Sequence, residues 1–167
     1  MLEEKDIYFM RLALEEAIRA EEEDEVPVGA VLVKDGQVIA RAHNEVIKQN
    51  DPTAHAEILA IRRAAKIIGN YRLLDSELYV TIEPCFMCAG AILHARLKRV
   101  VFGTFEPKMG AFGSLYNLSR DKRLNHHLEV KGGVLAEEAQ RLIQAFFRRR
   151  RGTEVAVTGA TRNRLVP

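Results

Sequence analysis

The chain has 167 residues, enough for one domain with a full hydrophobic core and without disulfide cross-links. Hydrophobic residues make up 47% of it, but no apolar run approaches the roughly 18 residues of a membrane span, so we expect no membrane partner. The net charge is only +2, yet residues 148–167 carry +5, which leaves −3 on the rest. Such a basic segment is typical of polyanion binding and equally of a solvated tail.

The N-terminus and the cysteine content indicate a reducing compartment. Residues 2–6 lack the basic and apolar regions of a signal peptide, so we expect the protein to be cytoplasmic. In that compartment, the two cysteines with C-x-x-C spacing are more typical of metal binding or redox chemistry than of a structural disulfide.

Strands and helices are expected to alternate along most of the chain. Periodicity and turn residues predict, in order, a helix over 5–21, strands over 28–33 and 37–42, a loop over 45–52, a helix over 54–68, a strand over 77–82, a helix over 85–94, a strand over 99–103, a loop over 104–118, a short strand over 128–130 and a helix from 135. Asp35-Gly36 predicts a tight antiparallel hairpin, and the later alternation favours parallel βαβ pairing. Residues 152–167 have too little apolar content to fold alone, so we expect a disordered basic tail.

Two motifs carry candidate metal ligands, Thr53-Ala-His-Ala-Glu57 and Thr81-Ile-Glu-Pro-Cys-Phe-Met-Cys88. Cys85 and Cys88 would share one face at the start of a helix, where the helix dipole favours thiolates. Together with His55 they would leave one zinc position open, as in catalytic zinc sites. A redox thiol pair and a structural zinc site remain alternative uses of the same two cysteines.

Glu57 is better suited to proton transfer than to metal binding. Zinc can lower the pKa of a bound water to about 7, and a nearby carboxylate can then carry protons to a ring nitrogen and a leaving amine. Residues two apart on an ideal helix point to nearly opposite sides. We therefore expect His55 at the N-terminal end of its helix, with Glu57 reaching into the same pocket. The pattern favours hydrolytic deamination.

These residues resemble the signature of the zinc nucleobase deaminases, H-x-E followed by P-C-x-x-C, which is a known example of this chemistry. The resemblance to bacterial tRNA-specific adenosine deaminases covers nearly the whole chain through Arg151, and further similar segments are 25–33, 51–57, 70–73, 87–91 and 99–103. It implies one deaminase domain over residues 1–151 with an α/β fold, a three-layer αβα sandwich around a mixed, mostly parallel five-stranded sheet. It also implies a homodimer with one Zn²⁺ per subunit, acting on the wobble adenosine of a tRNA anticodon stem-loop.

The resemblance also assigns roles to individual residues. It makes His55, Cys85 and Cys88 the zinc ligands and Glu57 the proton shuttle. It implies contacts with the substrate base, ribose or anticodon loop from Val28, Asn44, Ile82, Pro84, Glu106, Phe147 and Arg148. Glu106 stands where the family pattern has Asp, and one additional methylene can displace a hydrogen bond.

Two other functions use the same residues. A deaminase of a free base or nucleoside, such as guanine or cytidine, would share the zinc chemistry but would not need the basic segment. A zinc-stabilised nucleic-acid-binding module without catalysis would have no use for Glu57. Replacement of Glu57 and the dependence of binding on salt distinguish these alternatives from a tRNA deaminase.

Overall fold

A five-stranded sheet forms the centre of the fold. The structure is a computed structural model that describes residues 3–161, with side chains described through residue 152. The strands lie in the order β2-β1-β3-β4-β5. Their bounds are β1 (Gly29–Lys34), β2 (Gln37–His43), β3 (Ser76–Ile82), β4 (Arg99–Thr104) and β5 (Glu129–Lys131). β1 pairs antiparallel with β2 and β3, whereas β3, β4 and β5 pair in parallel. All strands of this sheet except β1 therefore point the same way, and the predicted mixed, mostly parallel sheet is confirmed.

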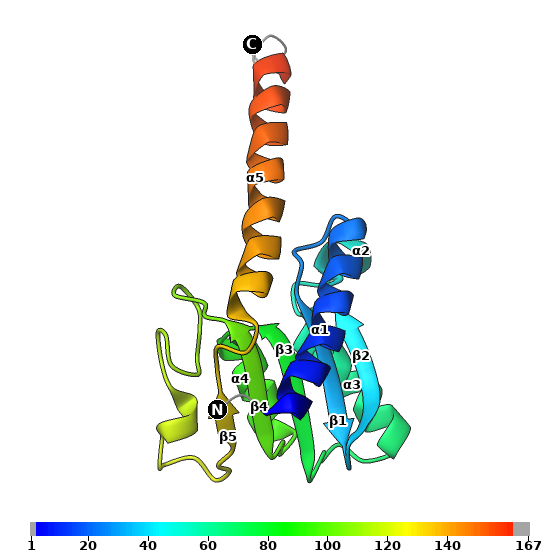
Figure 1. The fold of residues 1–167 in the computed structure, drawn as a ribbon, viewed down its shortest axis with the longest axis vertical. Helices are drawn as coiled ribbons and strands as arrows, with labels where there is room; N and C mark the ends of the chain where they lie inside the picture. The colour runs from blue at the N-terminus through cyan, green and yellow to red at the C-terminus, as the bar shows by residue number, and fades with distance from the viewer. Residues whose placement is uncertain (1–2, 162–167) are drawn as a thin grey trace.

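Helices cover both faces of the sheet, as Figure 1 shows. Their bounds are α1 (Glu4–Glu22), α2 (Val46–Gln49), α3 (Ala56–Ile68), α4 (Phe86–His94) and α5 (Ala136–Thr161). α1 and α5 pack on one face, and α3 and α4 pack on the other. The predicted three-layer αβα sandwich is confirmed. None of the helices within residues 3–161 is long and apolar enough to cross a membrane.

The core consists of two apolar clusters, one on each face of the sheet. Alternate residues of β3 point to opposite faces, as the two-residue period of a strand requires. Leu78 and Val80 therefore join the cluster beneath α3 and α4, while Tyr79 packs against Phe9 and Met10 beneath α1. The sheet is therefore buried on both faces, so it is a rigid support for the loops that leave the ends of its strands.

The carboxyl ends of β2, β3 and β4 meet at one edge of the sheet. Ile82 of β3 lies beside Thr104 of β4 in parallel register, and Gly29 at the start of the reversed strand β1 lies opposite His43 at the end of β2. The loops that leave this edge hold both sequence motifs. In open α/β folds, such an edge is where ligands bind.

Two segments differ from the expected elements. The predicted loop over 45–52 contains the short helix α2, whose first amides donate to a distant carboxylate: Ile47 N and Lys48 N lie 3.0 and 2.9 Å from Oε1 and Oε2 of Glu25. Four helical residues are too few for a periodic pattern, and their partner lies about twenty positions earlier in the sequence. Only the tertiary fold can bring the two together.

The C-terminal segment also differs in its backbone. We expected residues 152–167 to form a disordered tail, whereas α5 continues as a helix to Thr161. The side chains of residues 153–161, and residues 162–167 altogether, lie outside the described part of the chain. The last turns of α5 project beyond the body of the domain in Figure 1.

A buried ion pair joins α1 to the middle of the sheet. Asp6 is fully buried and accepts two hydrogen bonds from Arg99, at 2.7 and 2.9 Å, one from Tyr79 Oη at 2.9 Å and one from Lys131 Nζ at 3.0 Å. Burial alone would raise the pKa of Asp6, but these hydrogen bonds outweigh it and lower the pKa below its usual range. The carboxylate is therefore charged and fully paired.

We expect Asp6→Asn to lower the free energy of unfolding by about 3–5 kcal/mol, because it removes the closest and most deeply buried counter-charge of Arg99. The stabilisation by Asp6 is present above the pKa of an unfolded Asp, about 3.9, and is lost as the pH falls through the lower folded-state value. Denaturant unfolding at neutral pH measures the loss. Glu138→Gln is the control, because its pair with Arg11 is exposed and worth at most about 1 kcal/mol. Equal losses in the two variants would contradict this assignment.

Candidate metal and catalytic site

His55 lies at the start of α3, as predicted from its spacing to Glu57. It occupies the N-cap position with an extended backbone, so its side chain leaves the helix in a direction that an interior residue could not take. Asp51 and Thr53, which precede the helix, bond each other in a local turn and do not cap it. The first helical amide, Ala56 N, donates to Asn44 Oδ1 at 2.8 Å. A residue expected to touch the substrate therefore also fixes the helix that carries His55.

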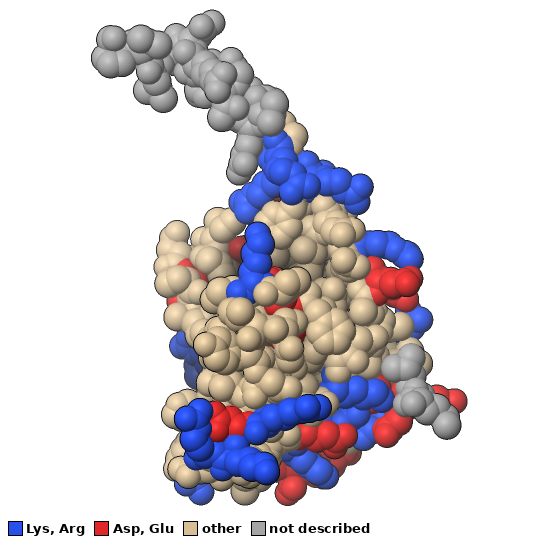
Figure 2. Space-filling view, turned by 90° about the vertical axis from the view of Figure 1, so that its left-hand side faces the viewer, with Lys and Arg blue, Asp and Glu red and all other residues tan. Residues whose placement is uncertain are grey.

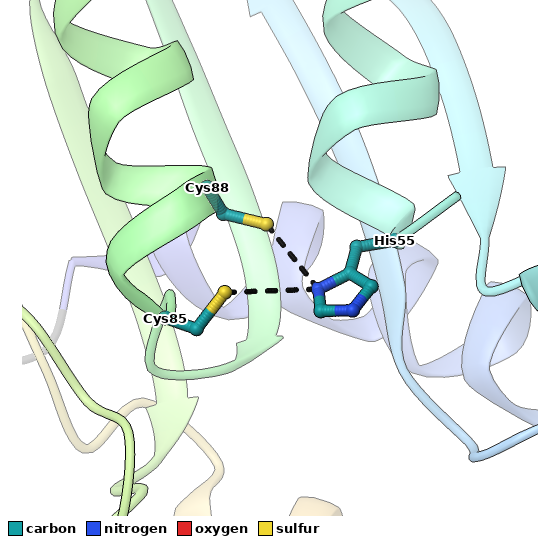
Figure 3. A group of neighbouring side chains, drawn as sticks. All are labelled: His55, Cys85 and Cys88. Carbon is teal, nitrogen blue, oxygen red and sulfur yellow. Dashed lines mark hydrogen bonds between the residues drawn. The ribbon is translucent and has the colours of Figure 1, made fainter. Parts of the chain in front are cut away.

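The two cysteines lie at the start of α4 and face His55 across the sheet edge (Figure 3). Cys85 is the N-cap residue and Cys88 belongs to the first turn. The Sγ atoms of Cys85 and Cys88 lie 3.7 and 3.5 Å from His55 Nδ1. Tetrahedral zinc with bonds of about 2.3 Å to sulfur and about 2.0 Å to nitrogen separates these atoms by roughly 3.5 Å. One imidazole and two sulfurs at this spacing fit zinc.

The two thiols differ in their pKa values. The pKa of Cys85 is lowered to about 4, first by a hydrogen bond from Cys88 and then by one from His55. The pKa of Cys88 is raised, because its proton is held by Cys85 and because the residue is buried. The pair therefore shares one proton next to the positive end of the α4 dipole. Cation binding at such a site releases protons, so it tightens as the pH rises.

Glu57 is the buried carboxyl group of the site. It lies in the first turn of α3, two residues after His55, and is 2% exposed. Burial raises the pKa of Glu57 above its usual value. A carboxyl group whose pKa lies closer to neutrality is better able both to accept and to return a proton. His55 and Glu57 therefore line one pocket, with His55 beside the two cysteines and Glu57 buried in the first turn of α3.

A cavity of about 460 Å³ opens directly above these side chains. Its volume is that of a pocket for a small molecule or one nucleobase, and its walls are largely apolar with a few polar groups. Among the predicted substrate contacts, Val28, Asn44, Ile82 and Glu106 line it. The full lining comprises Glu25, Val26, Val28, Asn44, Val46, Ile47, His55, Glu57, Ile82, Glu83, Cys85, Glu106, Met109 and Arg150.

Three predicted contacts do not line this cavity. Pro84 is buried in the turn between β3 and α4, and its carbonyl accepts a hydrogen bond from Ala111 N at 3.0 Å. Phe147 and Arg148 line a neighbouring hollow together with Lys108. That hollow lies next to the cavity, because residues of the same loop and of α5 contribute to both.

Sequence reasoning missed several lining residues. Arg150 belongs to a basic run in which no pattern singles out one arginine, and its guanidinium lies 5.2 Å from the ring centroid of Phe146. Met109 comes from an irregular loop and is 52% exposed. Glu25 ends the acidic run of residues 21–25. Such runs are usually exposed to solvent, yet the side chain of Glu25 is buried. Burial of an acid within a charged run leaves no periodic signal.

A second group of candidate ligands consists of Glu23, His43 and Glu45. His43 Nε2 lies 2.9 Å from Glu23, and Lys48 Nζ lies 3.7 Å from Glu23 and 3.8 Å from Glu45. The carboxylates are thus already paired with cationic partners, and we assign no metal to this group.

The segment that contains the site also matches a known protein family. The chain matches the cytidine and deoxycytidylate deaminase zinc-binding region over residues 3–104. The chain belongs to this family. The matched segment contains His55, Cys85 and Cys88, so the arrangement that fits zinc by geometry falls within the zinc-binding region of a deaminase.

Three individual proteins show which kinds of deaminase this chain is similar to. The tRNA-specific adenosine deaminase of Haemophilus influenzae is 56% identical over 149 residues, covering 89% of this chain and 86% of that protein. A solved structure from a study of A-to-I editing by tRNA:A34 deaminases at the wobble position is 47% identical and covers 81% of this chain and 98% of that chain, with a TM-score of 0.78. Guanine deaminase from Bacillus subtilis is 46% identical but covers 59% of this chain and 63% of its own, with a TM-score of 0.57.

We expect Cys88→Ala to weaken zinc binding by more than about 100-fold, because changes even beyond the direct ligands weaken it by about 10–100-fold. Glu57→Gln should keep its zinc, because Glu57 is not one of the clustered ligands. Metal analysis of the purified proteins after dialysis measures both. Full zinc content in Cys88→Ala would show that the metal is held elsewhere.

Proposed function

We propose that this protein converts the wobble adenosine of a tRNA anticodon to inosine by zinc-dependent hydrolytic deamination, with one Zn²⁺ per subunit. The observation that carries the proposal is 56% identity across 89% of the chain to a tRNA-specific adenosine deaminase. The reaction adds water to C6 of adenine and releases ammonia, so that adenosine and water become inosine and ammonia. Neither an oxidant nor a second substrate is required.

The metal-binding residues and the proton-transfer residue have separate roles in this proposal. His55, Cys85 and Cys88 would hold zinc, which when bound supplies Lewis acidity that makes water nucleophilic near neutral pH. Glu57 accepts the proton of the attacking water, delivers it to the ring nitrogen next to the reacting carbon, and passes a proton to the departing amine. Burial favours this cycle, since it raises the pKa of Glu57 and removes competing solvent.

The cavity walls explain how a planar base would be held. Val28 and Ile82 provide apolar contacts for the faces of the ring. Asn44 Oδ1 is already engaged by Ala56 N, so its Nδ2 group is the end that can donate to the substrate. Asn44 would thereby orient the base relative to Glu57 while it holds the helix of His55 in place.

The basic surface beside the cavity favours RNA over a free base. Arg150 lines the cavity, while Lys108, Arg148 and Arg151 line the adjacent hollow. Figure 2 shows Lys and Arg gathered where α5 leaves the body of the domain. Phe147 is 41% exposed in this hollow and could stack on an unpaired base. A single-stranded loop with its phosphates fits this combination of charge and aromatic surface.

We also propose that the protein acts as a homodimer in the cytoplasm, where tRNA is available. Large apolar side chains are exposed at and just after the end of α3, with Ile67 65%, Tyr71 73% and Leu74 52% accessible. Several large apolar side chains exposed in one short segment are a feature of protein contact surfaces.

We expect the protein to form inosine at the wobble position of a tRNA transcript with adenosine there, and Glu57→Gln to lower turnover by at least about 100-fold, within the range for general acid and base catalysis. Sequencing-based inosine mapping measures the product. Activity on free guanine or cytidine, without inosine in tRNA, would favour the free-base alternative. A Glu57→Gln variant with unchanged function would favour a non-catalytic binding module.

We expect the affinity for RNA to fall steeply as the salt concentration rises. Arg150→Ala should make the plot of log association constant against log salt concentration less steep by about 0.7, the value for one phosphate of a single strand. Binding of an anticodon stem-loop at several salt concentrations measures the slope. Lys34→Ala is the control, because Lys34 lies at the opposite end of β1 from the cavity. Equal slopes in all three proteins would exclude a phosphate contact from Arg150.

A further inference from the structure

The loop over residues 105–117 lies directly against the turn that carries the metal-ligating cysteines. Ala111 N donates to Pro84 O at 3.0 Å, and Cys85 pairs with Gly110 in an isolated antiparallel bridge. The loop contributes Glu106 and Met109 to the cavity wall. Its conformation therefore determines the shape of one side of the substrate pocket, although most of the loop has no regular secondary structure.

A single buried carboxylate binds this loop at three separate points. Glu83 is 1% exposed, and its Oε1 accepts from Glu106 N at 3.1 Å and from the hydroxyl of Ser114. Its Oε2 accepts from Phe112 N at 3.1 Å and from Ser114 N at 3.0 Å. Both oxygens are thus occupied by donors from the beginning, middle and end of the loop. A carboxylate accepts hydrogen bonds but donates none, so it matches a set of donors that no amide could satisfy.

The loop packs tightly around this carboxylate. A methyl group added at Gly110 would lie 2.3 Å from Glu83 Oε2 and 2.5 Å from the carbonyl oxygen of Glu106. Such distances are impossible without displacement of the loop or of the carboxylate. The absence of a side chain at this position lets the loop backbone close over Glu83.

Glu83 has no direct task in the chemistry proposed above. It borders the cavity, but its two oxygens face the loop donors, and it is not among the clustered metal ligands of residues 3–152. The mechanism uses Glu57 for proton transfer. A buried, fully engaged carboxylate next to the metal turn therefore calls for another explanation.

We propose that Glu83 is a positioning residue, which joins the 105–117 loop to the metal turn and thereby sets the geometry of substrate binding. Glu83 follows β3 directly and precedes Cys85 by two residues, so its backbone is held by the same rigid strand that places the ligand. The loop that forms one cavity wall and the turn that carries Cys85 then keep a fixed position relative to each other. This inference rests on the proposed function, because it concerns the RNA substrate of the same site.

The test compares Glu83→Gln with Ser114→Ala and with the control Glu129→Gln. In Glu83→Gln an NH₂ group faces backbone N–H donors, so at least one of them loses its acceptor. Ser114→Ala removes only the hydroxyl donor and leaves the carboxylate and its amide bonds in place. Glu129 is exposed and lies beside Arg99 at the far end of β4, away from the cavity.

Hydrogen exchange of peptides from residues 105–117 in the RNA-free, zinc-loaded protein provides the first readout. We expect exchange about 10-fold faster in Glu83→Gln, the low end of the effect of one lost hydrogen bond to a charged group. Ser114→Ala should show a smaller increase, and Glu129→Gln should match the parent. Unchanged exchange in Glu83→Gln would overturn the proposal. If Glu83→Gln does not fold, parental exchange in Ser114→Ala would overturn it.

Steady-state kinetics on an anticodon stem-loop provide the second readout. We expect KM to rise about 10-fold or more in Glu83→Gln while kcat changes less than about threefold, because a binding wall is lost and the reacting groups are intact. Zinc content should equal that of the parent. Lost zinc, or a fall in kcat as large as that in kcat/KM, would assign Glu83 to the metal or the chemistry instead. An inactive parent would refute the proposed function, while the exchange measurement would still decide the role of Glu83.

Discussion

The whole site depends on two helix N-termini that meet at one edge of the sheet. α3 begins with His55 and α4 begins with Cys85, and both helices pack on the same face with their first turns at the carboxyl edge. The positive ends of two helix dipoles therefore converge on one point, where they favour thiolates. The geometry that brings Nδ1 of His55 within 3.7 Å of both sulfurs follows from strand order and helix packing.

Buried carboxylates organise the rest of the molecule around that point. Asp6 joins α1 to the sheet, Glu25 holds the amides of α2 on one wall of the cavity, and Glu83 holds the loop on the other. Each of the three is surrounded by donors or cations, which is what keeps a buried charge tolerable. Glu57 differs from Asp6 in the net result, since burial raises the pKa of Glu57, whereas hydrogen bonds outweigh burial and lower the pKa of Asp6. The buried carboxyl group whose pKa is raised is the one that the proposed chemistry uses.

Substrate choice depends on surfaces that surround this common centre. The metal-binding residues and Glu57 would serve any base deaminase, so they do not distinguish adenosine in RNA from a free purine. The distinction lies in the walls and rim, where Arg150 adds a positive charge to the cavity wall and Lys108 and Phe147 extend the surface beyond it. These residues belong to the 105–117 loop and to α5, outside the sheet that places His55, Cys85 and Cys88.

Local spacing in the sequence was enough to predict which residues cluster as candidate metal ligands, because H-x-E and P-C-x-x-C are short motifs whose geometry follows from the start of a helix. It also predicted the sheet and its layers, since strand and helix periods depend on neighbouring residues. The roles of Asn44, Glu25 and Glu83 follow from the tertiary structure alone. Asn44 lies just after β2 and accepts from the first amide of α3, and the partners of Glu25 and Glu83 lie about 20–30 residues away in the sequence. A carboxylate that collects backbone amides from an irregular loop leaves no periodic signal, so its function depends on a fold that must first exist.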